Sequence, residues 1–225
     1  MTDTNFATQI EKLAETYANQ LKKKMGGRIT EMESDDNSHY LIYQVLGIEE
    51  NEGKLIDVYQ NKGRFLYKYA GSFLEEAAIL CFEYKFAKAQ RKVRIENQTG
   101  QKPKTFEIDC LVGQKAYEIK WRDATTDGDH ITKEHTRLQN IKLGGYTPIR
   151  IMFYYPNRSQ AIKIQQTLRT VYHGVGGEYY FGESSWKYIQ DETGIDLKSI
   201  LEKIAQKRAG KLQIEKEIKQ EIKKS

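Results

Sequence analysis

Two short apolar runs, FEIDCLV and AYEIKW, contain charged residues at positions where a buried strand normally has valine or isoleucine. Asp109 lies in the first run, and Glu118 and Lys120 lie in the second. Side chains two residues apart share one face of a strand, so Glu118 and Lys120 should point the same way. If the runs pair as an antiparallel hairpin, Asp109 lies beside Glu118. The spacing therefore predicts two carboxylates and one ammonium at a single place.

Such a group of charges is suited to the hydrolysis of phosphodiesters. Two neighbouring carboxylates repel each other unless a cation lies between them, and oxygen atoms are the ligands that Mg²⁺ prefers. A bound Mg²⁺ lowers the pKa of water and offsets negative charge in the transition state, while a lysine can hold a phosphate oxygen or the attacking water. We therefore expect Asp109 and Glu118 to bind Mg²⁺, with the carbonyl of Ile119 as a further ligand, and Lys120 to position or activate water.

The N-terminal part of the chain predicts packing elements rather than chemistry. Apolar residues recur every three or four positions over residues 5–25, which predicts an amphipathic helix that ends at Gly26. Residues 28–61 are mixed in character, with a strand-like run at 40–48, and predict irregular structure with short strands or helices. Residues 72–90 are apolar on nearly every side, which predicts a buried helix with a serine as its first cap.

The elements around the hairpin predict an α/β fold. After a basic, turn-rich stretch over residues 91–104, the two runs are joined by a turn at 112–115. Residues 131–145 then predict a helix that ends in two glycines, with His135 on its apolar face, and residues 147–156 predict a buried strand. The order helix, strand, strand, helix, strand indicates a mixed central β-sheet flanked by helices.

The C-terminal part of the chain continues with helices. Residues 159–173 predict a helix, and the following glycine-rich and aromatic stretch, residues 173–186, predicts a loop or hairpin. Asp196 predicts the N-cap of a final charged helix. No internal repeat or strong linker interrupts the chain, so we expect a single domain over residues 1–225 with a core at about 70–155.

Asp109, a hairpin and then Glu118-Ile119-Lys120 resemble the PD-(D/E)XK motif of a nuclease superfamily. The resemblance covers roughly residues 70–155, and Ile108 stands where the nominal motif has proline. It implies a restriction-endonuclease-like fold and the Mg²⁺ ligands and lysine role given above. It also allows a glutamate of the preceding buried helix, Glu75 in preference to its neighbour Glu76, to reach the metal site.

The wider stretch from EIKWRDATTDGDH to IMFYYPN, with GESSWKYIQDETGIDL further on, resembles restriction endonucleases of the ApaLI-like group. This resemblance implies a type II enzyme that hydrolyses both strands of duplex DNA at a short palindrome, 5′-GTGCAC. The chain has one set of Asp109, Glu118 and Lys120, so cutting both strands at one place predicts a homodimer. A restriction enzyme also implies a cognate DNA methyltransferase in the same restriction-modification system.

Residues beyond the motif are candidates for DNA contacts. Arg122, Asp123 and His130 lie in or beside the loop that follows the second run, close to where a scissile phosphate would lie. Lys133 and Arg137 are four residues apart, so they are predicted to share a helix face that can reach phosphates. The simpler interpretation of both groups is a solvated turn and a wet helix surface.

Composition sets limits on the function. The chain has 39% hydrophobic and 30% charged residues with a net charge of +5, which is typical of a globular protein and compatible with an anionic partner. Cys81 and Cys110 lie in apolar stretches and are expected to be reduced core residues, which favours a cytoplasmic protein. No signal peptide or run of about 18 apolar residues is present, so a membrane partner is not expected.

Two other functions fit the same residues. One is a structure-selective or repair nuclease of the same fold, which needs less base-reading surface than the roughly 70 residues that this chain has beyond its core. The other is a catalytically inactive DNA-binding domain. The intact set of Asp109, Glu118 and Lys120 argues against the second alternative, because loss of function gives no reason to keep three charges in apolar strands.

Overall fold

The computed structural model describes residues 4–100, 102–123, 125 and 127–222, and the chain divides into two compact units. One unit comprises residues 1–11 and 74–225, and the other comprises residues 12–73. The sheet and all the candidate site residues lie in the larger unit. That the chain forms a single nuclease domain stays a prediction.

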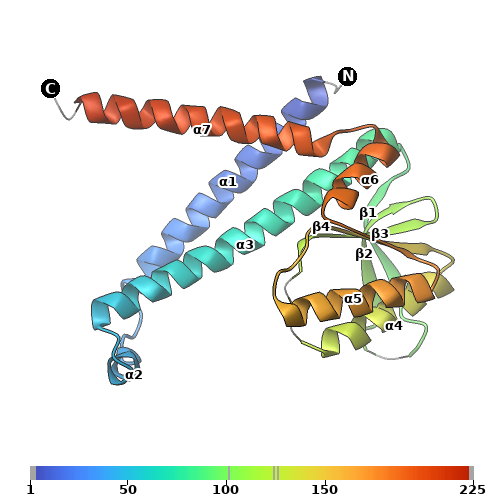
Figure 1. Cartoon of the computed structure of the whole chain (residues 1–225), viewed down its shortest axis with the longest axis horizontal. Helices are drawn as coiled ribbons and strands as arrows, with labels where there is room; N and C mark the ends of the chain where they lie inside the picture. Colours follow the sequence, from blue (N-terminus) through green and yellow to red (C-terminus); the bar gives the residue numbers. More distant parts are fainter. Residues whose placement is uncertain (1–3, 101, 124, 126, 223–225) are drawn as a thin grey trace. The chain divides into compact units, whose positions relative to one another are not determined.

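The smaller unit is helical. It contains most of α1 (Thr4–Met32), the short α2 (Tyr40–Val45) and the first part of α3 (Glu50–Lys85) (Figure 1). The ring of Tyr17 on α1 packs against Tyr69 and Phe73 on α3, with centroids 6.4 and 5.9 Å apart. These contacts join the two long helices within this unit.

Two predictions for this region were wrong. The helix expected to end at Gly26 continues to Met32, because a glycine costs a helix only about 1 kcal/mol, which packing along a long helix outweighs. The run at 40–48, described as strand-like, forms the short helix α2 and the turn after it, which the prediction of short strands or helices allowed. The irregular structure expected up to residue 61 was wrong, because the start of α3 occupies its last part.

The second part of α3 forms one wall of the larger unit. Its buried residues confirm the predicted burial of this segment, and they include Leu74, Ala77, Ala78, Ile79, Cys81 and Phe82. The predicted cap at Ser72 was wrong, because the helix begins at Glu50 and Ser72 lies within it. Cys81 and Cys110 are buried free cysteines, as expected.

Among the described residues, five strands form the central sheet in the order β1-β2-β3-β4-β5. They are β1 (Gln90–Glu96), β2 (Thr105–Val112), β3 (Lys115–Arg122), β4 (Thr147–Tyr154) and β5 (Glu178–Phe181). The first three are antiparallel, whereas β3, β4 and β5 run parallel. The predicted mixed sheet is therefore confirmed. Strand β1 begins in the stretch that was expected to be turn-rich, and β5 lies in the glycine-rich stretch that was predicted as a loop or hairpin.

Helices cover both faces of the sheet. Helices α4 (Asp129–Leu143) and α5 (Ser159–Gly174) lie side by side (Figure 1), and their apolar residues Leu138, Ile141, Ile164 and Leu168 share one core cluster with strand residues. On β3, Tyr117 stacks on Phe82 of α3, with ring centroids 4.3 Å apart, while the next residue, Glu118, pairs with Arg137 of α4. Successive residues of β3 therefore meet helices on opposite faces.

The remaining helices are α6 (Glu183–Thr193) and α7 (Leu197–Ile222). The predicted N-cap of the final helix is confirmed, because the Asp196 carboxylate accepts a hydrogen bond of 2.9 Å from the backbone N–H of Ser199. Within the described part of the chain, none of the helices combines the length and the apolar character that a membrane span requires.

Candidate active site

The pairing between strands β2 and β3 stops next to Asp109. The paired positions of β2 and β3 run only from Cys110↔Tyr117 to the turn at Val112↔Lys115. One residue further along β2, the Asp109 carboxylate takes the place of a backbone partner and accepts a hydrogen bond of 2.8 Å from the N–H of Ile119. The Asp109 side chain is thereby fixed between the two strands of the hairpin.

The three charged residues of the motif lie together at this opening. Lys120 Nζ lies 2.8 Å from Glu118 Oε1 and 3.9 Å from Asp109 Oδ2. The lysine ammonium thus provides positive charge beside both carboxylates. The hairpin spacing predicted this grouping of side chains, whereas the catalytic role of each residue stays a prediction.

The two carboxylates have opposite electrostatic environments. Burial and the negative charge of Glu118 raise the pKa of Asp109 to about 7, although Lys120 acts to lower it. Burial also acts to raise the pKa of Glu118, but Arg137 and Lys120 outweigh it and lower that pKa to about 2. Glu118 is therefore ionised at neutral pH, while the pKa of Asp109 lies close to neutral pH.

The protonation of Lys120 is also set by its neighbours. Burial acts to lower the pKa of the ammonium, but the carboxylates of Glu118 and Asp109 raise it above its ordinary value. The lysine is therefore charged at neutral pH. It can hold a phosphate oxygen or orient water, and it cannot accept a proton until a cation or the substrate changes this balance.

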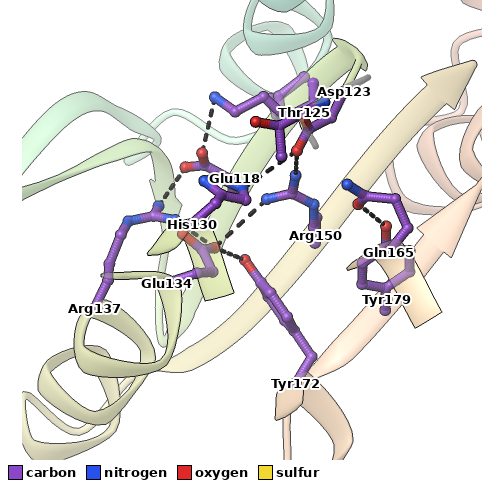
Figure 2. Close-up of polar contacts among 12 residues, drawn as sticks. Glu118, Asp123, Thr125, His130, Glu134, Arg137, Arg150, Gln165, Tyr172 and Tyr179 are labelled. Atoms are coloured by element: carbon purple, nitrogen blue, oxygen red, sulfur yellow. Dashed lines mark hydrogen bonds and ion pairs between the residues drawn. The ribbon is translucent and has the colours of Figure 1, made fainter. Parts of the chain in front are cut away.

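A network of buried charges contacts Glu118 through the oxygen that does not face Lys120 (Figure 2). Arg137, on α4, pairs with Glu118 and also lies 2.9 Å from Glu134 on the same helix. Glu134 in turn accepts a hydrogen bond of 2.6 Å from the hydroxyl of Tyr172 and lies 3.5 Å from Arg150. Each charge in the network therefore has an opposite partner, as buried ions require.

Sequence reasoning missed Glu134, Arg150 and Tyr172. Arg150 is fully buried on β4, within the run TPIRIMFYY that was predicted only as a buried strand. An arginine inside such an apolar run was a usable signal, because a buried guanidinium must have acidic partners. Glu134 and Tyr172 carried no comparable signal, because each lies on a helix with many polar residues.

The loop after β3 has a structural role through Asp123. Its carboxylate lies 2.7 Å from Arg150 and 3.3 Å from the His130 ring, and it accepts a hydrogen bond of 3.1 Å from the N–H of Thr125. Burial acts to raise the pKa of Asp123, but His130 and Arg150 lower it below its ordinary value. The sequence placed Asp123 and His130 near the site but did not indicate that they contact each other or Arg150.

The prediction that Lys133 and Arg137 together form an exposed helix surface was wrong for Arg137. Lys133 is exposed, whereas Arg137 is only 8% exposed and forms the two ion pairs described above. The prediction of a core histidine at His135 was also wrong, because that residue is exposed. The helix α4 is rotated so that Glu134, Arg137, Leu138 and Ile141 face inward. Apolar periodicity could not predict the burial of Glu134 and Arg137, because both residues are charged.

The two glutamates of α3 have different neighbours. Glu76 lies 2.9 Å from Arg91 of β1. Glu75 is half-buried, and burial raises its pKa while the charge of Lys120 acts to lower it. Glu75 therefore interacts electrostatically with Lys120 and Glu118, while its approach to a metal ion stays a prediction.

Comparison with known proteins decides the family. A family model described as ApaLI-like restriction endonuclease matches residues 1–206. The chain belongs to this family. No curated protein and no solved structure matches it. The match extends from α1 almost to the middle of α7, so it includes the helical unit as well as the sheet.

The donor set at the opening of the sheet suits the metal ion expected of a restriction endonuclease. Within the described residues, no group of three or more His, Cys, Asp or Glu side chains is arranged to hold a metal ion. Asp109 and Glu118 nevertheless offer carboxylate oxygens on either side of one ammonium, and the proximity of Glu118 is one cause of the raised pKa of Asp109. Oxygen donors of this kind match the preference of Mg²⁺, and the remaining ligands of Mg²⁺ in proteins are commonly water.

Proposed function

We propose that this member of the ApaLI-like restriction endonuclease family is a type II enzyme that hydrolyses phosphodiesters in double-stranded DNA with Mg²⁺. Family membership supports nuclease activity on DNA. The observation that carries the proposal is the position of Lys120, 2.8 Å from Glu118 and 3.9 Å from Asp109, at the opening of the hairpin. Two acids and one lysine at this spacing are the groups that such hydrolysis needs.

In this proposal each residue has a distinct task. Asp109, Glu118 and the carbonyl of Ile119 hold the metal ion, and Glu75 approaches the same place from α3. When bound, Mg²⁺ supplies a water of lowered pKa and positive charge against the transition state. Lys120 holds the water or a phosphate oxygen in line. Arg137 keeps Glu118 ionised and fixed, because it pairs with this carboxylate inside the protein.

The DNA contacts are proposed for residues around the loop after β3. Arg122 and Lys133 carry positive charge at partly or fully exposed positions and suit phosphate binding. His130 lies at the start of α4 beside Asp123, and its proposed DNA contact is at this end of the helix. We assign Asp123 and Arg137 to holding this surface in place, because both lie in the ion network.

The target is proposed to be a short palindrome, and the resemblance to the ApaLI-like group implies 5′-GTGCAC. Each chain contains one set of Asp109, Glu118 and Lys120. Two copies related by a two-fold axis cut both strands most simply, and such a dimer reads a two-fold sequence. A DNA methyltransferase of the same sequence specificity is the expected partner in the cell.

The test is digestion of phage DNA by the purified protein with Mg²⁺, Ca²⁺ or EDTA. We expect discrete bands with Mg²⁺, binding with little cutting with Ca²⁺, and no cutting in EDTA. Glu118→Gln is the matched variant, because it keeps the side-chain size and removes the charge, and we expect cleavage to fall at least ~100-fold. Full activity in EDTA contradicts the metal-dependent mechanism. Cutting confined to branched DNA favours a structure-selective nuclease instead.

A further inference from the structure

Lys92 has an unusual backbone conformation in the middle of an edge strand. Its φ is +52°, and among the described residues it is the only one other than glycine with a positive φ. An L-residue in the left-handed region costs about 1–2 kcal/mol, and a long side chain gains nothing locally in return. Residues held in this way cluster at functional sites, so Lys92 requires an explanation.

The surroundings of Lys92 explain how the strain is maintained. On one side, Arg91 is tied to α3 through hydrogen bonds of 2.8 Å to Glu83 and 2.9 Å to Glu76. On the other side, Val93 pairs with Ile108 of β2 and packs against the core cluster. Lys92 is therefore held between two anchored neighbours, and its conformation cannot relax without the loss of one of these contacts.

The register places Lys92 beside the active site. The paired positions of β1 and β2 pass from Arg91↔Cys110 to Val93↔Ile108, which leaves Lys92 across from Asp109 without a paired position of its own. The pairing of β2 with β3 also ends one residue before Asp109. The sheet is thus open on both sides of Asp109, and Lys92 lies at the outer side of this opening. Irregular pairing next to an active site commonly serves to redirect a side chain.

The charge of Lys92 acts on the same site. Lys92 is exposed, and none of the ion pairs in the described part of the chain includes it. Its positive charge acts, together with that of Lys120, to lower the pKa of Glu75, which burial raises. The environments of the two lysines therefore differ: Lys120 is held by two carboxylates, whereas Lys92 presents its ammonium to solvent at the edge of the site.

We propose that the ammonium of Lys92 binds a phosphate of the DNA backbone that adjoins the phosphodiester to be cut. This inference rests on the proposed function, because it assumes DNA at the opening beside Asp109. A glycine at this position would remove the strain at once, so a purely structural role gives no reason for lysine. An exposed cation that the strand holds against its backbone preference suits a ligand with negative charge along its length.

The test compares variants of Lys92 that separate charge from strain. Lys92→Gly removes both, Lys92→Asn removes the charge but tolerates the left-handed backbone, and Lys92→Arg keeps the charge. Lys104→Asn is the matched control, because Lys104 is an exposed lysine at the end of the loop between β1 and β2. Three quantities are measured for each: the midpoint of thermal unfolding, KM for duplex cleavage with Mg²⁺, and the salt dependence of duplex binding with Ca²⁺.

We expect Lys92→Gly to unfold at a higher temperature than the wild-type protein and to have a KM about tenfold higher. Its slope of log binding constant against log salt should fall by about 0.9 per chain, the value for one lost phosphate contact. Lys92→Asn should have the same raised KM and lowered slope as Lys92→Gly. Lys92→Arg and the Lys104→Asn control should both have the KM and slope of the wild-type protein. A gain in stability together with a loss of binding distinguishes functional strain from a structural role.

Unchanged KM and salt slope in both Lys92→Gly and Lys92→Asn would overturn the inference while leaving the proposed nuclease intact. If Lys92→Gly does not fold, Lys92→Asn and Lys92→Arg decide the matter. If the wild-type protein binds duplex DNA but does not cut it, the proposed function fails and the salt slope still tests Lys92. If it does not bind DNA at all, both proposals are wrong.

Discussion

Arg150 and Glu118 are direct partners in the parallel register of β3 and β4, yet the Arg150 guanidinium pairs with Asp123 and Glu134 instead of Glu118. Glu118 is left to Arg137 and to Lys120. One of its oxygens thus faces the buried network and the other faces the lysine at the opening of the hairpin. The carboxylate is held from behind, and the side toward Lys120 is the one that a metal ion can approach.

This arrangement predicts that Arg137 sets the pH range of cleavage. Arg137 is the main charge that lowers the pKa of Glu118, against burial, to about 2. Arg137→Gln should raise that pKa, and because Glu118 must be ionised to hold the metal, the acid limb of the pH–rate profile should move to higher pH. Breaking a buried ion pair also destabilises a protein by about 3–5 kcal/mol. Arg137→Lys should partly restore both the profile and the stability, whereas a profile that does not move in Arg137→Gln would contradict a positioning role.

The raised pKa of Asp109 predicts that removal of its carboxyl group increases stability at alkaline pH, although it abolishes cleavage. Burial and Glu118 raise its pKa from 3.8 to about 7, so between these pH values the folded state binds more protons than the unfolded state. Stability from this group is therefore present at low pH and is lost as pH rises toward about 7. Asp109→Asn cannot ionise, so at pH 8 without metal it should be more stable than the wild-type protein, on the order of 1–3 kcal/mol. The gain should vanish near pH 4, and cleavage should be lost.

The control for this prediction is Asp191→Asn, which changes an exposed carboxylate that pairs with Lys187 on the same helix. It should show neither the gain in stability at pH 8 nor the loss of cleavage. Thermal unfolding at pH 4, 6 and 8 measures the effect. Equal stability of Asp109→Asn and the wild-type protein at pH 8 would show that the ionised Asp109 carries no cost.

Lys120 predicts a separation between binding and turnover. Lys120→Ala should reduce cleavage at least ~100-fold and leave most of the DNA affinity, because one lysine is a small share of the phosphate contacts. It also removes the cation between Glu118 and Asp109, so added Mg²⁺ should raise the unfolding temperature of this variant more than that of the wild-type protein. Lys115→Ala is the matched control, because Lys115 lies on the same strand and pairs with Glu192 at the other end. Normal cleavage by Lys120→Ala would mean that the motif was misread.

The sequence predicted the acids and the lysine better than it predicted their support. Alternation along two short strands and a turn of known length determine where Asp109, Glu118 and Lys120 meet, and these are local rules. The contact of Arg150 with Asp123 joins residues 27 positions apart, and that of Tyr172 with Glu134 joins residues 38 positions apart. No periodicity encodes such contacts, because they depend on how α4 and α5 pack on the sheet.

The same limit explains the errors in the fold. Strand β1 is mostly exposed, so the apolar alternation that marks a half-buried strand is weak there. The glycines at 26 and 27 were read as a stop, but nothing in the sequence showed that α1 has a long partner helix. Predictions succeeded where neighbours in the sequence decide the structure and failed where distant contacts do.

The last prediction concerns symmetry. One chain has one set of Asp109, Glu118 and Lys120, and one such set cuts one strand at a time. Two copies around a two-fold axis place the two sets on opposite strands at equal distances from the axis, so both strands are cut at equivalent positions of a palindrome. The protein should therefore have about twice its 26.2 kDa mass when bound to DNA and leave identical ends on both strands.

Mixing wild-type chains with an excess of Glu118→Gln chains should convert double-strand cuts into nicks at the same site, because each mixed dimer has one working set. Sequencing of the ends and the ratio of nicked to linear plasmid measure this, and random ends, or linear product without nicks, would contradict the two-fold enzyme.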